Sequence, residues 1–138
     1  MADSDCDGLF AVLHASSVLE ARVEARLAEI NLSLAKLAAL RQLSRAGDSL
    51  PLGQLADRLA CVKSNVTQLV DRLEADGLVT RLADSGDRRS RLAVLTEKGR
   101  QACAHGDEIR HRTEREVFSV LSPDEANQLQ RLLAKLTS

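Results

Sequence analysis

The hydrophobic period of the chain changes at Gly77, and this change restricts the fold more than any other feature. Before the glycine, four apolar residues follow the i, i+3, i+4, i+7 spacing of one buried helical face: Val66, Leu69, Val70 and Leu73. After it, the segments LVTRL and RLAVLT are rich in strand-forming residues, and a polar segment of about eight residues separates them. Glycine readily supplies the left-handed residue that ends a helix. The sequence therefore predicts a helix that stops at Gly77, followed by a β-hairpin with a long polar tip.

Helices are also predicted before this unit. Residues 9–30 place apolar side chains in a broad helical stripe, which has more apolar surface than a small monomer normally leaves uncovered. A second helix follows Ser33, whose hydroxyl is a candidate N-cap. A short extended segment at residues 50–52 and a short helix at residues 54–59 complete the first half of the chain.

Two more helices are predicted after the hairpin. Thr96 can cap a long helix, although Gly99 and Gly106 lower the helix propensity of this segment. Ser122 then begins the last helix, with Pro123 at its first position and a glutamate at its third, which together predict a capping box. Five apolar residues form the inner face of that helix: Ala126, Leu129, Leu132, Leu133 and Leu136.

The composition agrees with packed helices and narrows the class of protein. Aromatic residues make up only 1% of the chain, so Leu, Val and Ala must fill the core. A length of 138 residues suits one domain with a modest core. No apolar run approaches the roughly 20 residues of a membrane span, and the N-terminus is acidic, unlike a secretory signal. We therefore expect a cytoplasmic protein that does not bind membranes.

The cysteines give little sign of a metal or disulfide framework. Cys6, Cys61 and Cys103 are odd in number and widely separated, so we expect reduced thiols, with Cys61 as a small buried residue. Cys103, Asp107 and His111 recur at i, i+4 and i+8 on one helical face, but we interpret them as surface polar residues. No metal or cofactor is predicted.

The order of the elements is that of a winged helix-turn-helix, a fold that is mainly α with a small β-hairpin. A helix fits the DNA major groove, and the exposed face of this one offers hydroxyl and amide side chains to base edges. Arginines at a hairpin tip suit the neighbouring minor groove or its phosphates. A net charge of -1 does not exclude DNA, because only the field within about 10 Å matters. The predicted contacts with double-stranded DNA are Lys63, Ser64, Asn65, Thr67, Gln68, Arg72, Arg88, Arg89 and Arg91.

Several charged residues near this surface have a second interpretation. Asp71 and Glu74 would repel phosphates, so we expect structural roles for them. Arg72 can contact a phosphate or pair within the chain. For Arg81 and Arg91, which lie on the predicted strands, contact with the DNA backbone also stays open.

Residues 55–99 resemble the multiple antibiotic resistance regulator (MarR) family. The family pattern VDRLE.DGLV.R is present from Val70 to Arg81, and a wing with Asp87 and Arg89 follows. A closing Leu-Thr pair and Gly99 complete the match. The resemblance implies a homodimer whose first and last two helices interlock and whose two winged domains bind a pseudo-palindromic operator.

The resemblance also implies residue roles and boundaries. Arg89 would enter the minor groove, Asp87 would orient the wing by pairing with an arginine, and Thr67 and Gln68 would touch bases in the major groove. Residues 1–32 would form an N-terminal dimerisation helix and residues 33–99 the winged helix-turn-helix DNA-binding domain. Residues 100–138 would form the C-terminal dimerisation helices.

The function that follows is transcriptional regulation without enzymatic activity. We expect a repressor of its own or a neighbouring operon, relieved by a small-molecule effector or by thiol oxidation. Cys6 is a candidate redox residue, because a thiolate near a helix N-terminus has a lowered pKa. The alternative is a winged-helix module that binds proteins and no specific DNA. A metal hydrolase at Cys103, Asp107 and His111 lacks a further acid or base at motif spacing.

Overall fold

The structure is a computed structural model that describes residues 7–59, 65–84 and 86–138, with the backbone alone at positions 84 and 87–90. None of the described helices is long and apolar enough to cross a membrane. The elements in chain order are α1 (Gly8–Ala28), α2 (Leu34–Arg45), β1 (Ser49–Pro51), α3 (Leu52–Arg58), α4 (Val66–Ala75), β2 (Val79–Asp84), β3 (Asp87–Leu95), α5 (Glu97–Phe118) and α6 (Pro123–Thr137).

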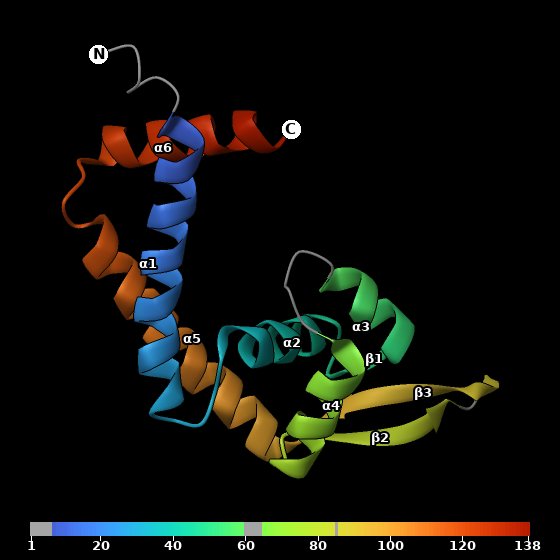
Figure 1. Cartoon of the computed structure of the whole chain (residues 1–138). Coiled ribbons are helices and arrows are strands. Elements are labelled where there is room, and N and C mark those ends of the chain that lie inside the picture. The colour runs from blue at the N-terminus through green and yellow to red at the C-terminus, as the bar shows by residue number, and fades with distance from the viewer. Residues whose placement is uncertain (1–6, 60–64, 85) are drawn as a thin grey trace.

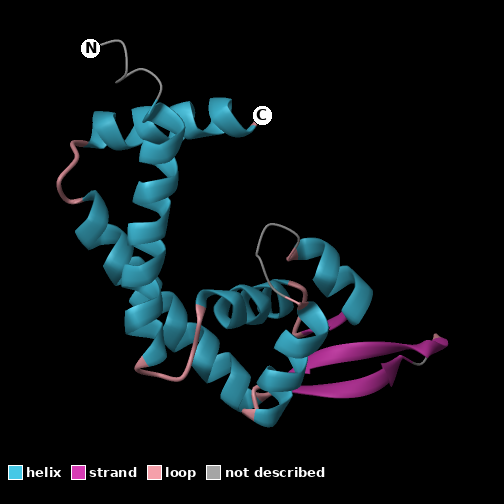
Figure 2. Ribbon diagram, viewed as in Figure 1, coloured by secondary structure: helices cyan, strands magenta, loops and turns pink. Residues whose placement is uncertain are grey.

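The elements form two groups that α5 connects (Figure 1). The terminal helices are α1, α5 and α6, and α1 packs against α5. The winged-helix unit comprises α2, α3, α4 and the small sheet at the start of α5. The hairpin of β2 and β3 projects from this unit as an arm (Figure 2). The predicted fold, mainly α with a winged helix-turn-helix between long terminal helices, is confirmed.

Local sequence signals determine where the helices begin. The Ser33 hydroxyl accepts a hydrogen bond from the Lys36 N–H at 3.1 Å, and the Thr96 hydroxyl accepts one from the Gly99 N–H at 3.0 Å. Ser122 and Glu125 form the complete capping box ahead of α6. Each such cap satisfies backbone donors that the first helical turn leaves unpaired, and typically stabilises a helix by about 1 kcal/mol. These predicted helix starts are confirmed.

The sheet has three antiparallel strands in the order β1-β3-β2. Val79 pairs with Leu95 at the base of the hairpin, and Asp84 pairs with Asp87 near its tip. The predicted connection of about eight residues is therefore wrong, because the strands continue to positions 84 and 87. Backbone pairing alone can extend a two-stranded arm in solvent, so its side chains need not follow an apolar alternation. A shift in the strand register lies between Ala83 and Asp84, near the polar tip.

The hydrophobic core lies in the winged-helix unit and beneath α5. Two glycines let α5 approach this core closely. A Cβ at Gly99 would lie 2.1 Å from the carbonyl oxygen of Leu78, and one at Gly106 would lie 2.8 Å from the Leu37 side chain. The lowered helix propensity of these glycines is thus accompanied by close helix packing. The largest fully buried side chains are Leu27, Leu37, Leu40, Leu43, Leu55, Leu73, Val70, Val79 and Thr113.

The ends of the terminal helices lie outside this core. Leu27 is the buried residue of α1, and α6, described over its whole length, contains no buried residue. The face predicted to be the inner side of α6 is largely open in the single chain, where Ala126 is half-buried and the four leucines of this face are exposed. The exposed large apolar residues of these helices and the turn between α5 and α6 are Leu9, Phe10, Val12, Leu13, Val18, Leu19, Val120, Leu129, Leu132, Leu133 and Leu136.

Candidate nucleic-acid interface

Helix α4 presents a polar face next to the hairpin. Its N-cap is Asn65, whose side-chain oxygen accepts a hydrogen bond from the Gln68 N–H at 3.3 Å. The apolar face of α4 packs inward, with Leu69, Val70 and Leu73 buried and Val66 half-buried, as predicted. Three predicted contacts on the opposite face are exposed on the helix itself: Thr67, Gln68 and Arg72.

Asn65 therefore has a local role in addition to its predicted DNA contact. Its side-chain oxygen is engaged with the helix backbone, which fixes the first turn of α4 and with it the direction of Gln68. Lys63, Ser64 and Cys61, which were predicted around the helix start, lie outside the described residues.

Strand β2 is tied to α4 by Arg81. Its Nη2 atom lies 2.6 Å from the Asp71 Oδ1 atom, and its Nη1 atom lies 3.4 Å from the Glu74 Oε1 atom. The same Nη2 atom donates to the carbonyl oxygen of Thr67 at 3.4 Å, and the Arg81 backbone N–H donates to Glu74 Oε2 at 3.2 Å. The prediction that Asp71 and Glu74 have structural roles is confirmed, and Arg81 is their partner within the chain.

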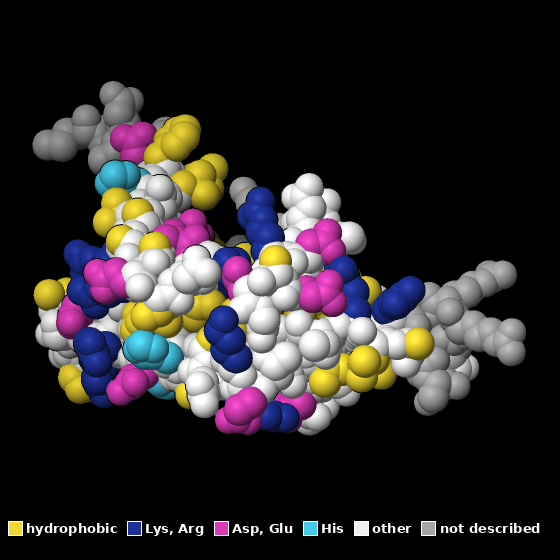
Figure 3. Space-filling view, turned by 90° about the horizontal axis from the view of Figure 1, so that it is seen from below, with side chains coloured by type: hydrophobic (Ala, Val, Ile, Leu, Met, Phe, Trp, Pro, Cys, Tyr) yellow, Lys and Arg dark blue, Asp and Glu magenta, His cyan; other side chains and the backbone are white. Residues whose placement is uncertain are grey.

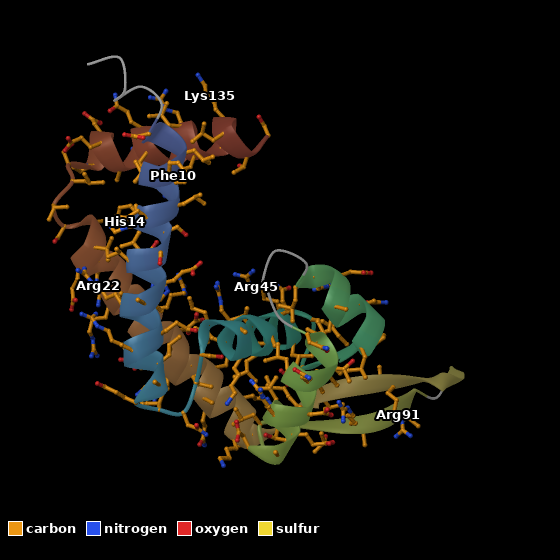
Figure 4. All side chains as sticks on the ribbon, in the orientation of Figure 1. Phe10, His14, Arg22, Arg45, Arg91 and Lys135 are labelled. Atoms are coloured by element: carbon orange, nitrogen blue, oxygen red, sulfur yellow. The ribbon has the colours of Figure 1, made fainter. Side chains whose placement is uncertain are left out.

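The arginines of the wing lie on β3. The backbones of Arg88, Arg89 and Arg91 follow this strand along the hairpin, and Arg91 is paired with Ala83 of β2. The Arg91 side chain is exposed and extends from the arm into solvent (Figure 4). The side chains of Asp87, Arg88 and Arg89 lie outside the description, so their predicted roles remain predictions.

Charge on the molecule is paired locally. Seen from below, basic and acidic side chains lie beside one another over the described surface in view (Figure 3). Arg100 illustrates the pairing, because its guanidinium lies 2.8 Å from Asp48 and 2.7 Å from Glu97. These two carboxylates raise the pKa of Arg100. Among the described residues beside α4 and on the arm, Arg72 and Arg91 are exposed.

The three residues considered as a metal site have other surroundings. Cys103 is buried at 7% exposure, so its predicted place on the surface is wrong. Asp107 lies 3.2 Å from Arg41 and 3.1 Å from Arg110. Burial, and then the charge of Asp107, raises the pKa of the Cys103 thiol, while Arg41 acts in the opposite direction. In the described parts of the chain, no group of His, Cys, Asp and Glu side chains could hold a metal ion. Cys6 lies outside the described residues.

A pocket that the sequence did not predict lies where the winged-helix unit meets the terminal helices. It has a volume of about 280 Å³ and is lined by the α1–α2 connection, the end of α4 and one side of α5. Leu32, Leu78 and Ala102 supply apolar surface, and Lys98 and His105 supply polar nitrogen atoms. Its walls come from three separate segments, so no sequence spacing could have indicated it.

Comparison with known proteins finds similar transcriptional regulators. Residues 32–90 match the model of the MarR family. Over 84 residues the chain is 42% identical to YkoM, an uncharacterized HTH-type transcriptional regulator of Bacillus subtilis (strain 168). That alignment covers 61% of this chain and 54% of YkoM, so the chain spans about half the length of the curated relative it matches.

Solved structures extend the likeness over the whole chain. A probable transcriptional regulator from Pseudomonas aeruginosa is 29% identical with a TM-score of 0.82, and the match covers 96% of this chain and 98% of that one. A MarR mutant from Escherichia coli complexed with operator DNA has a TM-score of 0.82 over 97% of this chain and 96% of its own. At 22% identity, the second comparison shows the fold alone. The chain is thus similar to the MarR family over residues 32–90 and shares its overall fold with solved transcriptional regulators.

Proposed function

We propose that this chain is a transcriptional regulator that binds double-stranded DNA sequence-specifically as a homodimer. It acts as a repressor of its own or a neighbouring operon and releases its pseudo-palindromic operator when a small ligand binds. The observation that carries this proposal is the exposed polar face of α4 beside an arginine-bearing arm. The Escherichia coli protein that shares this fold was crystallised with operator DNA, which supports the same use of the fold here.

Two structural elements would read the operator. Thr67 and Gln68 lie on the exposed face of the first helical turns, where side chains can reach base edges in the major groove. A bidentate Gln68 would favour adenine. Arg89 belongs to β3 of the arm, and an arginine on such an arm would suit the adjoining minor groove.

The homodimer is supported by the apolar surface of the terminal helices. Leu9, Leu13 and Leu132 are exposed at 67%, 54% and 57%, respectively, although leucine usually lies inside folded proteins. A second copy carries the same surface, so α1 and α6 can cover each other across a two-fold axis. The same axis would set two α4 helices toward successive major grooves, which matches a pseudo-palindromic site.

The pocket between the two groups of elements supports a small-ligand signal. Its lining of apolar walls with Lys98 and His105 suits a small apolar molecule that carries an anionic or hydrogen-bonding group. Because it touches both the end of α4 and α5, a bound molecule can alter their relative position. Thiol oxidation at Cys103 is disfavoured in comparison, since burial raises the pKa of its thiol and oxidation requires an accessible thiolate.

The test is binding to the DNA upstream of the protein's own gene, measured by fluorescence anisotropy across a salt series. We expect at least about 10³-fold preference over a scrambled duplex, with a log-log salt slope of several units. Arg89→Ala should weaken operator binding by roughly 1 to 3 kcal/mol at fixed salt. Equal, weak binding to the upstream duplex and to a random-sequence pool would contradict the proposal and favour the protein-interaction module.

A further inference from the structure

Two acidic side chains lie on the surface that the proposed function turns toward DNA. Asp71 and Glu74 follow Thr67 at i+4 and i+7, so all three residues lie on one side of α4. Their side chains are 56% and 43% exposed, respectively. A carboxylate near a phosphate backbone repels it, and two carboxylates on the recognition helix should oppose its entry into the groove.

Arg81 lies against these two carboxylates. Its guanidinium approaches Asp71 at 2.6 Å and Glu74 at 3.4 Å. The Arg81 side chain is 21% exposed, less than either acidic partner. Its guanidinium therefore lies between β2 and α4, and the carbonyl oxygen of Thr67 accepts a further hydrogen bond from it.

We propose that Arg81 is a positioning residue that neutralises the charge of Asp71 and Glu74, so that α4 can approach the phosphate backbone. The inference rests on the proposed DNA binding. Arg81 acts through its two carboxylate partners and makes no contact with DNA. Without its charge, α4 would present two unpaired negative charges beside Thr67 and Gln68.

The local backbone makes this role separable from a role in folding. The Arg81 N–H donates to Glu74 through the main chain, so replacement of the Arg81 side chain leaves that tether between β2 and α4 in place. Amide side chains at positions 71 and 74 would still accept hydrogen bonds from Arg81 while carrying no charge. Charge can therefore be removed from either side of the pair with little change in shape.

The experiment compares the operator affinity of the full chain and its variants at low and high salt. Arg81→Gln should weaken binding about tenfold at low salt and less at high salt, because ions screen the exposed carboxylates. The triple variant Arg81→Gln, Asp71→Asn, Glu74→Gln should recover affinity to within about twofold of the original chain. If Arg81 contacts a phosphate directly, the triple variant stays as weak as Arg81→Gln, and the inference is overturned.

A second pair of variants covers the case in which Arg81→Gln unfolds. Asp71→Asn with Glu74→Gln, in a chain that retains Arg81, should bind the operator as tightly as the original or more tightly. Weaker binding by this variant, with an unchanged melting temperature, would also overturn the inference. Arg81→Lys should restore most of the affinity, because it keeps the positive charge.

Arg100 provides the matched control. Its guanidinium also pairs with two carboxylates, those of Asp48 at 2.8 Å and Glu97 at 2.7 Å. These residues lie just before β1 and at the start of α5, not on α4. Arg100→Gln should leave operator affinity unchanged, and a loss equal to that of Arg81→Gln would show a general effect of removing an arginine. If the original chain shows no preference for the operator, the proposed function itself fails. If it does and Arg81→Gln binds equally well, only the role of Arg81 fails.

Discussion

The winged-helix unit and the ends of the terminal helices use the same residue types in opposite ways. Leu40 of α2 and Leu73 of α4 are fully buried within one chain. Leucines of α6 at similar helical spacing are exposed, with Leu132 at 57%. The first region buries its core within one chain, whereas the second leaves most of an apolar face exposed. Hydrophobic periodicity therefore identifies a buried face but does not say which chain buries it.

The largest expected effect comes from a substitution that creates a cavity in the core of the winged-helix unit. Leu40→Ala should lower the free energy of unfolding by about 2 to 5 kcal/mol, because Leu40 is fully buried and its neighbours can fill the space only in part. Chemical denaturation followed by circular dichroism measures this change. The loss should not depend on protein concentration, and a clear dependence would show that this core is also completed by a second copy.

A charge on the open face tests the other region. Leu132→Asp should raise the dissociation constant of the proposed dimer at least about tenfold, because the aspartate would have to be desolvated at its interface. Sedimentation velocity at micromolar concentrations should then show a monomer with unchanged helical content. Arg131→Asp, one position away on α6, is the control for added negative charge. An original chain that already sediments as a monomer would remove the distinction between the two regions.

The alkylation rate of the Cys103 thiol gives a smaller test of burial in the winged-helix unit and beneath α5. In a variant with Cys6→Ser and Cys61→Ser, alkylation by iodoacetamide at neutral pH should be slow in the folded chain and fast after denaturation. Burial and the charge of Asp107 both raise the pKa of this thiol, so little thiolate is present. Mass spectrometry over time measures the rate. Equally fast alkylation in both states would place Cys103 on the surface.

The smallest expected effect concerns the contact between α1 and α5. Arg26 lies 2.5 Å from Glu116, and its hydrogen bond lowers the pKa of that carboxyl group. A depressed carboxyl pKa stabilises the fold above the unfolded value and loses this contribution as the pH falls through the folded value. The original chain should thus melt slightly above Glu116→Gln at pH 7, and this difference should shrink as the pH falls below the usual range of a glutamate. A difference that does not change with pH would have a cause other than this ion pair.

The sequence predicted the elements better than their surroundings. The caps at Ser33, Thr96 and Ser122 involve residues close in the chain, so spacing alone identified them. The length of the arm was underestimated, because strand pairing near a polar tip depends on the backbone and leaves no apolar alternation. The burial of Cys103 was also missed, since the α2 residues that surround α5 cannot be inferred from spacing within α5.

In the candidate site, too, the sequence predicted the helix face but not the contacts between elements. The exposed face of α4 followed from periodicity, because buried residues define the opposite side of a helix. The partner of Asp71 and Glu74 could not be chosen from sequence, since Arg72, Arg81 and several wing arginines were all available. The way β2 packs against α4 brings the Arg81 guanidinium to 2.6 Å from the Asp71 carboxylate, and this packing cannot be read from the sequence.

The close approach of α5 to Leu78 at Gly99 gives this helix the geometry of a lever. One end of α5 lies against Leu78, three residues after the end of α4, and the other end leads into α6. Its 22 residues span about 33 Å at about 1.5 Å per residue. A rotation of about 5° at the α6 end would displace the opposite end by about 3 Å, close to the roughly 3.4 Å spacing of stacked base pairs. In the proposed dimer, a small change in how the two copies pack would thus shift α4 by about one base step relative to bound DNA.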